Sequence, residues 1–353
     1  MRTILKLLFT ASVLALFISC GSSKVVQQPK EKLNLQAVSV GFYNLENLFD
    51  TIDQSNIDEE FLPNGAMKWT SYKYKAKLKN MSTAISKLGL ELTPGGVSIL
   101  GVSEIENRGV LEDLVKQPAI ASRTYEIVHY DSPDRRGVDV GLLYNPRDFI
   151  VTNSKSYRLR TEDPNFLTRD QLMVSGYLLG EKVHVIVNHW PSRTGGEVES
   201  EPKRLAAAAL TKSIVDSLYK VDASAKIIVM GDLNDDPFNK STAEVLGAKK
   251  NMEEVASNGL YNTLWRTLES GVGSLAYNGQ WNLFDQIIIS EPFLKADNTH
   301  LRFWKAEIFN RSFLIQQEGT YKGSPLRTHA GGVWLNGYSD HFPTLIYLTK
   351  ERK

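Results

Sequence analysis

Six short polar motifs contain the side chains in this chain that could do chemistry. Each lies close to one end of an apolar, β-branched run and supplies a carboxylate, a histidine or a side-chain amide. These residues are Asn44, Glu104, His189, Asp232, Asn234, Asp285, Asp340 and His341. Carboxylate and amide oxygens bind hard divalent cations, and imidazoles exchange protons near neutral pH. Any one of them alone is more often a structural core group. Six such motifs at strand ends predict one shared site.

Spacing within two of the motifs restricts where the side chains point. In Gly231-Asp232-Leu233-Asn234, the Asp and the Asn are two positions apart, so they emerge on the same side of a strand end. In Ser339-Asp340-His341, the adjacent Asp and His cannot share one face of a strand. At the entrance to a strand, however, both can reach a cleft.

The elements that must position these motifs are mostly strands. Apolar runs predict buried strands at 37–43, 97–102, 125–128, 138–144, 172–179, 183–188, 227–230, 286–289 and 344–348. Helical patterns are fewer, at 74–88 and at 201–219, the latter with Pro202 at its start. Strands 125–128 and 138–144 are joined by a piece too short for a crossover helix, which predicts antiparallel pairing. We therefore expect an α/β fold with two largely antiparallel sheets packed face to face and helices outside.

The motifs, in this order from Asn44 to His341, resemble those of the endonuclease/exonuclease/phosphatase superfamily, to which deoxyribonuclease I belongs. Gly231-Asp232-Leu233-Asn234 and Ser339-Asp340-His341 are similar to its two most diagnostic motifs. The resemblance implies a four-layered α/β/β/α sandwich that hydrolyses phosphate esters. It implies Mg²⁺ or Mn²⁺ as the cofactor, with Ca²⁺ as an alternative, and metal contacts for Asn44, Glu104 and Asp340.

The same resemblance implies roles for the other motif residues. Asp232 and Asn234 match the pair that orients the attacking water and a phosphate oxygen. Asp285 matches the carboxylate partner of His341, and such a partner fixes the tautomer of the imidazole and raises its basicity. His189 matches the family's second histidine, which we expect to hydrogen-bond the transferring phosphoryl group. Whether His341 serves as a general base or as a cation in the transition state stays open at this point.

Two further segments resemble features of a bacterial subgroup of this superfamily, residues 44–50 and residues 131–137. In the second, Arg135 or Arg136 is a candidate phosphate contact, with a solvated turn as the alternative. Glu106 is either an additional metal ligand or an ordinary carboxylate at a strand end.

The N-terminal residues predict export. Arg2 and Lys6 precede an apolar run at 7–18, which is too short to span a bilayer and ends at Ser19-Cys20-Gly21. The only cysteine of the chain, Cys20, is placed as in a lipoprotein, whose mature first residue carries the lipid. We expect a membrane-anchored protein of the cell envelope with a lipoprotein signal peptide at 1–19, a flexible tether at 20–34 and one domain at 35–353.

The composition narrows the classes of function. Hydrophobic residues make up 42% of the chain and charged residues 23%, as in a globular protein with a sizeable core. A formal net charge of +1 argues against tight non-specific binding to duplex DNA. We expect a monomeric phosphodiesterase or nuclease acting on a phosphate ester, with DNA and RNA as candidate substrates. The alternatives are a phosphomonoesterase, a phospholipid-directed phosphodiesterase that uses the aromatics around Phe303-Trp304 and Phe309, and a non-catalytic ligand-binding lipoprotein.

Overall fold

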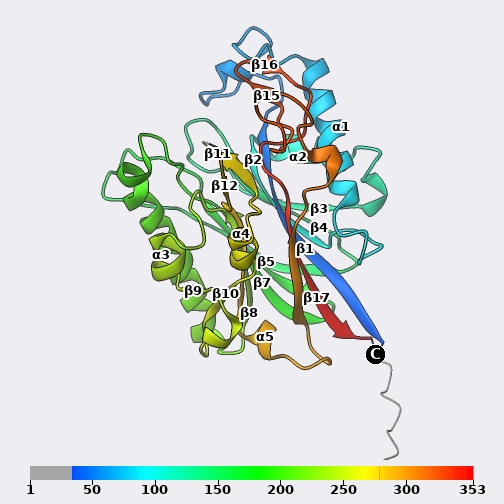
Figure 1. Ribbon diagram of the computed structural model, residues 1–353, viewed down its shortest axis with the longest axis vertical. Coiled ribbons are helices and arrows are strands. Elements are labelled where there is room, and N and C mark those ends of the chain that lie inside the picture. The colour runs from blue at the N-terminus through cyan, green and yellow to red at the C-terminus, as the bar shows by residue number, and fades with distance from the viewer. Residues whose placement is uncertain (1–33, 278, 353) are drawn as a thin grey trace, which may run out of the picture. The chain divides into compact units, whose positions relative to one another are not determined.

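Two β-sheets lie against each other at the centre of the structure, a computed structural model that describes residues 34–352 apart from residue 278 (Figure 1). The predicted signal peptide and all but the last residue of the predicted tether fall outside this range. Residues from Leu35 onward form one compact unit. The six-stranded sheet has the order β14-β17-β1-β2-β4-β3, and the seven-stranded sheet has the order β5-β6-β7-β8-β13-β10-β9.

The chain forms four strands of the six-stranded sheet, then the whole seven-stranded sheet, and then returns to the six-stranded sheet for its last two strands. The strands of the six-stranded sheet are β1 (Leu35–Leu48), β2 (Ile99–Ile105), β3 (Glu126–His129), β4 (Asp139–Tyr144), β14 (Arg302–Ile308) and β17 (Thr344–Glu351). Those of the seven-stranded sheet are β5 (Phe149–Tyr157), β6 (Gln171–Leu178), β7 (Glu181–His189), β8 (Lys226–Asp232), β9 (Ala248–Lys249), β10 (Leu260–Asn262) and β13 (Asp285–Ser290). Two small hairpins are β11 (Leu275–Tyr277) with β12 (Gln280–Asn282) and β15 (His329–Ala330) with β16 (Val333–Trp334). The helices are α1 (Ser71–Lys87), α2 (Arg108–Val115), α3 (Glu197–Val221), α4 (Trp265–Glu269) and α5 (Pro292–Lys295).

Strand β8 shows why its run of apolar residues is unbroken. Ile228 and Met230 point into the core between the two sheets, whereas Ile227 and Val229 point into the core beneath α3. A strand buried on both faces has no solvent side, so polar residues do not alternate along it. The pairing is mixed, because β1 with β2, β7 with β8 and β9 with β10 are parallel while the other pairs are antiparallel.

Helices cover the outer faces of both sheets, so the prediction of a four-layered α/β/β/α sandwich is confirmed. Helices α1 and α2 bury Leu78, Ile85 and Leu111 against the outer face of the six-stranded sheet. Helix α3 buries Ala208 and Ile214 against the seven-stranded sheet. Figure 1 shows α3 and α1 on opposite sides of the strands.

The structure corrects the predicted start of the longest helix. Helix α3 begins at Glu197, so Pro202 lies inside it rather than at its start. The extra turn forms because side chains supply donors to its carbonyls: Ser200 Oγ donates to Gly196 O and Arg204 Nη2 donates to Glu197 O, at 2.5 and 2.8 Å. Pro202 removes only the helical donor to the carbonyl of Val198, an exposed residue of the first turn, so its loss is tolerated there.

The aromatic residues considered for lipid contact belong to edge strand β14 and the residue after it. Phe309 is buried, and Phe303 packs on the inter-sheet core, where its ring centroid lies 5.8 Å from that of Tyr261. Of these aromatic residues only Trp304 is exposed, and it is the residue left unpaired at the register shift between Phe303 and Lys305. These residues do not form a protruding hairpin. Among residues 34–352, no helix has both the length and the apolar character needed to cross a membrane.

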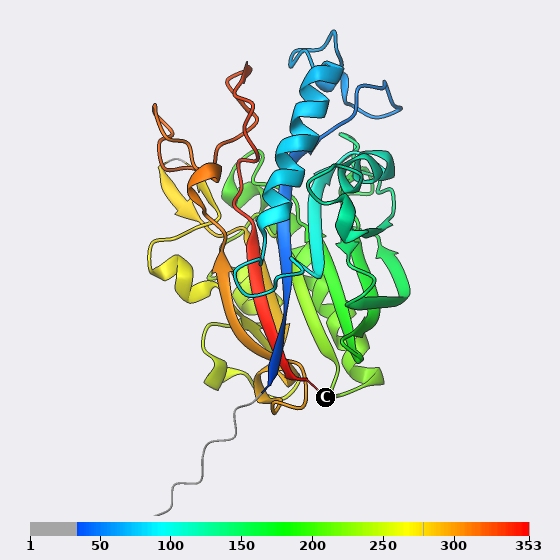
Figure 2. The same ribbon diagram turned by 90° about the vertical axis from the view of Figure 1, so that its right-hand side faces the viewer.

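Strand β1 runs along the length of the structure between β17 and β2 (Figure 2). The chain enters the sheet at Leu35, whereas Asn44 lies near the other end of the strand. Loops that follow β1 and the β15–β16 hairpin come together beyond that second end, where Trp69 packs edge-on against Trp334 with ring centroids 5.8 Å apart. The polar motifs gather at this same end.

Candidate active site

Three site residues come from neighbouring strands of the seven-stranded sheet. His189 ends β7 and is paired in register with Asp232, which ends β8. Asp232 is in turn paired with Asp285, the first residue of antiparallel β13. Adjacent strands lie about 5 Å apart, so this register alone brings an imidazole and two carboxylates together.

Asn44 and Glu104 come from the six-stranded sheet, at places where its ladder is irregular. The pairing of β1 with β2 shifts register after Asn44, and the pairing of β2 with β4 shifts at Glu104. Glu104 and Asn234 both adopt left-handed backbone conformations, with φ of 56° and 51°. Such a conformation costs a residue with a Cβ about 1–2 kcal/mol. Strain of this kind is retained where the surrounding structure holds a side chain in a functional direction.

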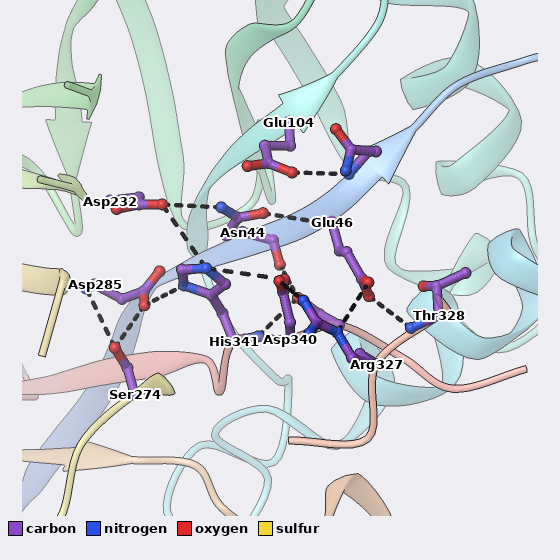
Figure 3. A network of polar contacts seen from close by, with 12 residues as sticks. Asn44, Glu46, Glu104, Asp232, Ser274, Asp285, Arg327, Thr328, Asp340 and His341 are labelled. Atoms are coloured by element: carbon purple, nitrogen blue, oxygen red, sulfur yellow. Dashed lines mark hydrogen bonds and ion pairs between the residues drawn. The ribbon is translucent and has the colours of Figure 1, made fainter. Parts of the chain in front are cut away.

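Hydrogen bonds join the two sheets at the site (Figure 3). Asn44 Nδ2 donates to Asp232 Oδ2 at 3.0 Å, and Asn44 Oδ1 accepts from the backbone amide of Glu46 at 2.8 Å. Ser339 Oγ donates to the carbonyl oxygen of Asn44 at 2.7 Å, which fixes the start of the segment that contains His341. Because Asn44 is fully buried, these bonds also satisfy polar groups that water cannot reach.

His341 and Asp285 form a tight buried pair. His341 Nδ1 lies 2.6 Å from Asp285 Oδ2, the oxygen that also accepts from Ser274 Oγ at 2.5 Å. Burial by itself would lower the pKa of His341, but the charge and hydrogen bond of Asp285, with smaller contributions from Asp340 and Asp232, raise that pKa well above its usual value. The imidazole is therefore held as a cation at neutral pH.

The remaining imidazole, His189, has the opposite character. Burial lowers its pKa well below the usual value, and Arg169, Arg136 and His341 lower it further. Its Nε2 lies 3.7 Å from Asp232 Oδ2 and 3.9 Å from Glu104 Oε1, while its Nδ1 has no hydrogen-bond partner among the described residues. A neutral imidazole placed in this way can donate to or accept from a bound group.

Asp232 lies at the centre of the site. Burial, helped by the charges of Asp285 and Glu104 and opposed by the charge of His341, raises the pKa of its carboxyl to about 7. A carboxylate that titrates near neutral pH can accept a proton from water. The backbone amide of Asn234 donates to its Oδ1 at 3.0 Å and fixes the orientation of the carboxylate.

The donors at the site fit a divalent cation of the Mg²⁺ type. Ligand atoms of Glu104, His189 and Asp232 lie within 4.8 Å of one another, as do those of Asp232, Asp285 and His341. A buried carboxylate whose pKa is raised by neighbouring carboxylates, as that of Asp232 is, is the arrangement that a bound divalent cation relieves. Glu104 and Asp232 would hold such an ion through oxygen, and the metal contacts implied for Asn44 and Asp340 stay predictions. Asp340 Oδ2 accepts from Arg327 Nη2 at 2.5 Å, and Asp340 Oδ1 lies 3.8 Å from His341 Nε2.

A pocket of about 320 Å³ opens over these residues. Its walls are Glu104, Arg136, His189, Ser192, Arg193, Thr194, Asp232, Asn234, Leu275, Tyr277, Phe284 and His341. Arg136 therefore lines the pocket, where about half of its side chain is exposed, and its contact with phosphate stays a prediction. Arg135 lines a different cavity and donates to Asn165 O. Glu106 also lines that second cavity, where it accepts from the backbone amide of Asp50.

A model of the Endonuclease/Exonuclease/phosphatase family matches residues 39–350. The chain belongs to this family. No curated protein matches the sequence significantly. Family membership, together with the buried carboxylate and histidine clusters, makes the protein a phosphoesterase whose site can bind metal.

Solved structures of family members share the fold. Humanized D. rerio TDP2 matches with a TM-score of 0.54 at 12% identity, over 88% of this chain and 98% of that one. D. rerio TDP2 in complex with a single-strand DNA product matches with a TM-score of 0.50 at 14% identity, over 88% and 98%. A Bacteroides thetaiotaomicron mannosyl-6-phosphatase gives 0.50 at 14% identity, over 88% and 99%. At such identities the likeness concerns the fold alone.

Sequence reasoning missed the residues that support the site of this family member from outside the motifs. Ser274 binds Asp285, and Arg327 binds Asp340. Glu46 and Lys77 lie beside Arg327, and Lys77 is completely buried. Glu46 is within a segment that the sequence had marked, but no role was assigned to it. A lysine in the middle of a helix and an arginine in a loop have no periodic signal that would single them out.

Proposed function

We propose that this phosphoesterase is a divalent-metal-dependent phosphodiesterase, with nucleic acid as the first substrate class to test. The observation that supports it best is that His341, paired with the buried Asp285, lines one pocket together with Asp232 and Glu104. A phosphodiester is an anion that repels an attacking hydroxide. It therefore needs positive charge at the phosphoryl oxygens and a base for the water.

Each of these residues has a separate role in the proposed reaction. Asp232 accepts the proton of the attacking water. His341 presents a cation toward the phosphoryl group, and Asp285 keeps it protonated. Glu104 and Asp232 would hold Mg²⁺ or Mn²⁺, whose contribution when bound is to neutralise charge on the phosphoryl oxygens. Arg136 supplies a further positive group at the pocket wall.

A second candidate, a phosphomonoesterase or a phosphodiesterase of small or lipid esters, is favoured by the neighbouring cavity. This cavity of about 870 Å³ lies on the other side of the segment that carries Arg136. Its walls contain five carboxylates, Asp50, Glu106, Asp131, Asp134 and Asp139, and two arginines, Arg108 and Arg135. An excess of negative charge opposes a polyanion that continues past the catalytic pocket. Short substrates would end at the catalytic pocket and would not meet this repulsion.

A substrate panel separates these functions. The full chain is assayed on bis-p-nitrophenyl phosphate, p-nitrophenyl phosphate, single-stranded DNA, RNA and sphingomyelin with Mg²⁺, Mn²⁺, Ca²⁺ or EDTA. We expect diester cleavage that EDTA abolishes and that His341→Ala lowers by about 10²-fold or more. His300→Ala is the matched control, because His300 is exposed and outside the pocket. Activity that survives EDTA contradicts the metal requirement, and cleavage of the monoester alone selects the second candidate.

We further propose that the chain is exported and anchored through a lipid on Cys20. The support is the charged start, the short apolar run and the single cysteine at its end. Labelled palmitate should enter the wild-type chain and be absent from Cys20→Ala. Equal labelling of both chains would remove the proposal.

A further inference from the structure

The segment that carries Arg136 is held to the seven-stranded sheet by a buried ion pair. Arg136 lies between β3 and β4 of the six-stranded sheet, whereas Arg169 lies just before β6 of the other sheet. Asp134 connects the two: its Oδ2 accepts from Arg169 Nη1 at 3.2 Å, and only 7% of its side chain is exposed. These contacts join the two sheets beside the catalytic pocket, which Arg136 lines.

Asp134 fixes the backbone of Arg136. Its Oδ1 accepts from the backbone amide of Arg136 at 3.0 Å, and its carbonyl oxygen accepts from the backbone amide of Gly137 at 3.0 Å. An aspartate that accepts from the amide two residues further on stabilises a turn. Gly137 ends this turn with a φ of 71°, a left-handed conformation that glycine adopts without strain. The point from which the Arg136 side chain starts is therefore defined.

The same carboxylate oxygen orients the side chain of Arg136. Arg136 Nε lies 3.8 Å from Asp134 Oδ1, and among the residues that the structure describes no other carboxylate forms an ion pair with Arg136. About half of the Arg136 side chain is exposed, and a long exposed side chain otherwise samples many rotamers. Asp134 favours the rotamers that keep the guanidinium at this wall of the catalytic pocket.

Arg169 compensates the charge of Asp134. Its side chain is 6% exposed, and its Nη2 donates to the carbonyl oxygen of Trp190 at 2.6 Å. Burial lowers the pKa of Arg169, and the charge of Asp134 is the largest effect that opposes this lowering. One carboxylate thus faces two guanidiniums. A positive charge is left at Arg136 for an anion, which Asp134 and Arg136 alone would not provide.

The backbone of Trp190 connects this ion pair to the catalytic residues. Trp190 directly follows β7, and its carbonyl oxygen accepts from Asn234 Nδ2 at 3.0 Å as well as from Arg169. The backbone amide of Trp190 donates to the carbonyl oxygen of Asp232 at 2.9 Å. A continuous series of hydrogen bonds therefore sets the position of the Arg136 segment relative to Asp232.

We infer that Asp134 is a positioning residue, itself held by Arg169, that directs the guanidinium of Arg136 at the phosphoryl group of the substrate without neutralising it. The inference rests on the proposed phosphodiesterase function. A guanidinium binds phosphate oxygens through two parallel N–H donors, so its orientation matters as well as its charge. Loss of Asp134 should therefore weaken substrate recognition through Arg136.

A double-mutant cycle tests this dependence with bis-p-nitrophenyl phosphate and Mg²⁺. In the otherwise wild-type full chain, Asp134→Ala should lower kcat/KM by about fivefold or more. In the Arg136→Ala chain, the same replacement should change kcat/KM by less than about twofold, because no guanidinium is left to orient. Asp222→Ala is the matched control, because Asp222 also accepts from the amide two residues further on, that of Ser224, but outside the pocket.

A purely structural role for Asp134 gives a different result. Its removal leaves Arg169 buried without a carboxylate, which should lower stability, so thermal unfolding is measured for every variant. If Asp134 served the fold alone, its loss would lower kcat/KM by the same factor in both chains, and that outcome would overturn the inference. An unchanged kcat/KM for Asp134→Ala would overturn it too. If Asp134→Ala does not fold, Asp134→Asn, which keeps the shape and removes the charge, takes its place in the cycle.

Binding of inorganic phosphate separates this inference from the proposed function, because it requires no turnover. In calorimetric titrations with Mg²⁺ present, Asp134→Ala and Arg136→Ala should each weaken phosphate binding by about fivefold or more, and the double variant should bind within about twofold of Arg136→Ala. Independent losses in a chain that cleaves the diester would refute the inference alone. Phosphate binding with the expected pattern in a chain that cleaves no diester would contradict the proposed function alone.

Discussion

Replacing Asp285 by asparagine tests the central feature of the site, the charged state of His341. Asp285→Asn keeps the volume and one hydrogen bond but removes the negative charge that lies 2.6 Å from His341 Nδ1. Asp285 is fully buried, so no solvent replaces that charge. Burial lowers the pKa of the imidazole, and in the variant the charge that mainly opposes this lowering is absent. We expect the pKa of His341 to fall from well above its usual value to that value or below.

The size of the effect follows from the role of the imidazole. With a pKa near about 6.5, only about one His341 in a hundred is protonated at about pH 8.5. If catalysis uses the cation, kcat of Asp285→Asn relative to kcat of the wild type should fall about a hundredfold between about pH 6 and about pH 8.5. If His341 were a general base, the variant would instead keep or gain activity as the pH rises. Loss of half of a buried ion pair should also lower the free energy of unfolding by about 3 kcal/mol.

The assay is kcat on bis-p-nitrophenyl phosphate at saturating Mg²⁺ across this pH range, with thermal unfolding measured on the same samples. Ser274→Ala is the control, because it removes a hydrogen bond from an uncharged donor to the same oxygen of Asp285 and leaves the carboxylate charge in place. It should cost about 2 kcal/mol of stability and give no new decline of kcat at alkaline pH. An Asp285→Asn profile parallel to that of the wild type would refute the assignment of His341 as the cation.

Three further outcomes are expected. Asp232→Asn should lower kcat by about 10²- to 10⁴-fold. Wild-type activity should rise as the pH increases through about 7 or below, because Asp232 then loses its proton, and this rise should be absent from the variant. Arg136→Ala should lower kcat/KM about tenfold or more, and Arg135→Ala less than about twofold, because only Arg136 lines the catalytic pocket. Burial raises the pKa of Glu106 to about 7, so the folded state holds this proton more tightly than the unfolded chain, and stability is lost as the pH rises from about 4.5 to about 7. Glu106→Gln should therefore stabilise the fold by about 3 kcal/mol at about pH 8 and have little effect at about pH 4, as measured by urea unfolding.

Much of the fold could be predicted because burial leaves a direct mark on the sequence. Strand β8 is apolar at every interior position since both of its faces are covered, and Asp232 marks the point at which the cover ends. The same transition from apolar to polar located His189 and Asp285. Strands β5 and β14 were missed. β5 has exposed and half-buried positions along most of its length, and in β14 the register shift beside Phe303 breaks the alternation that would have identified it.

Only part of the candidate site could be predicted from the sequence, and the reason differs from that for the fold. A motif gives a residue type and a strand end, but not the hydrogen bonds made there. Asn44 donates to Asp232 and accepts from Glu46, and Asp340 is engaged by Arg327. Arg327 is 13 residues from Asp340 in the sequence and 281 from Glu46, and no local pattern links the three. Such partners follow from the packing of the loops beyond the sheets.

The direction of β1 determines which end of the domain is joined to the preceding segment. Leu35 begins this strand, and Asn44 lies nine residues further along, about 30 Å away. With a lipid on Cys20, as proposed, the point of attachment would be remote from the pocket and would not obstruct the entry of phosphate esters that arrive by diffusion.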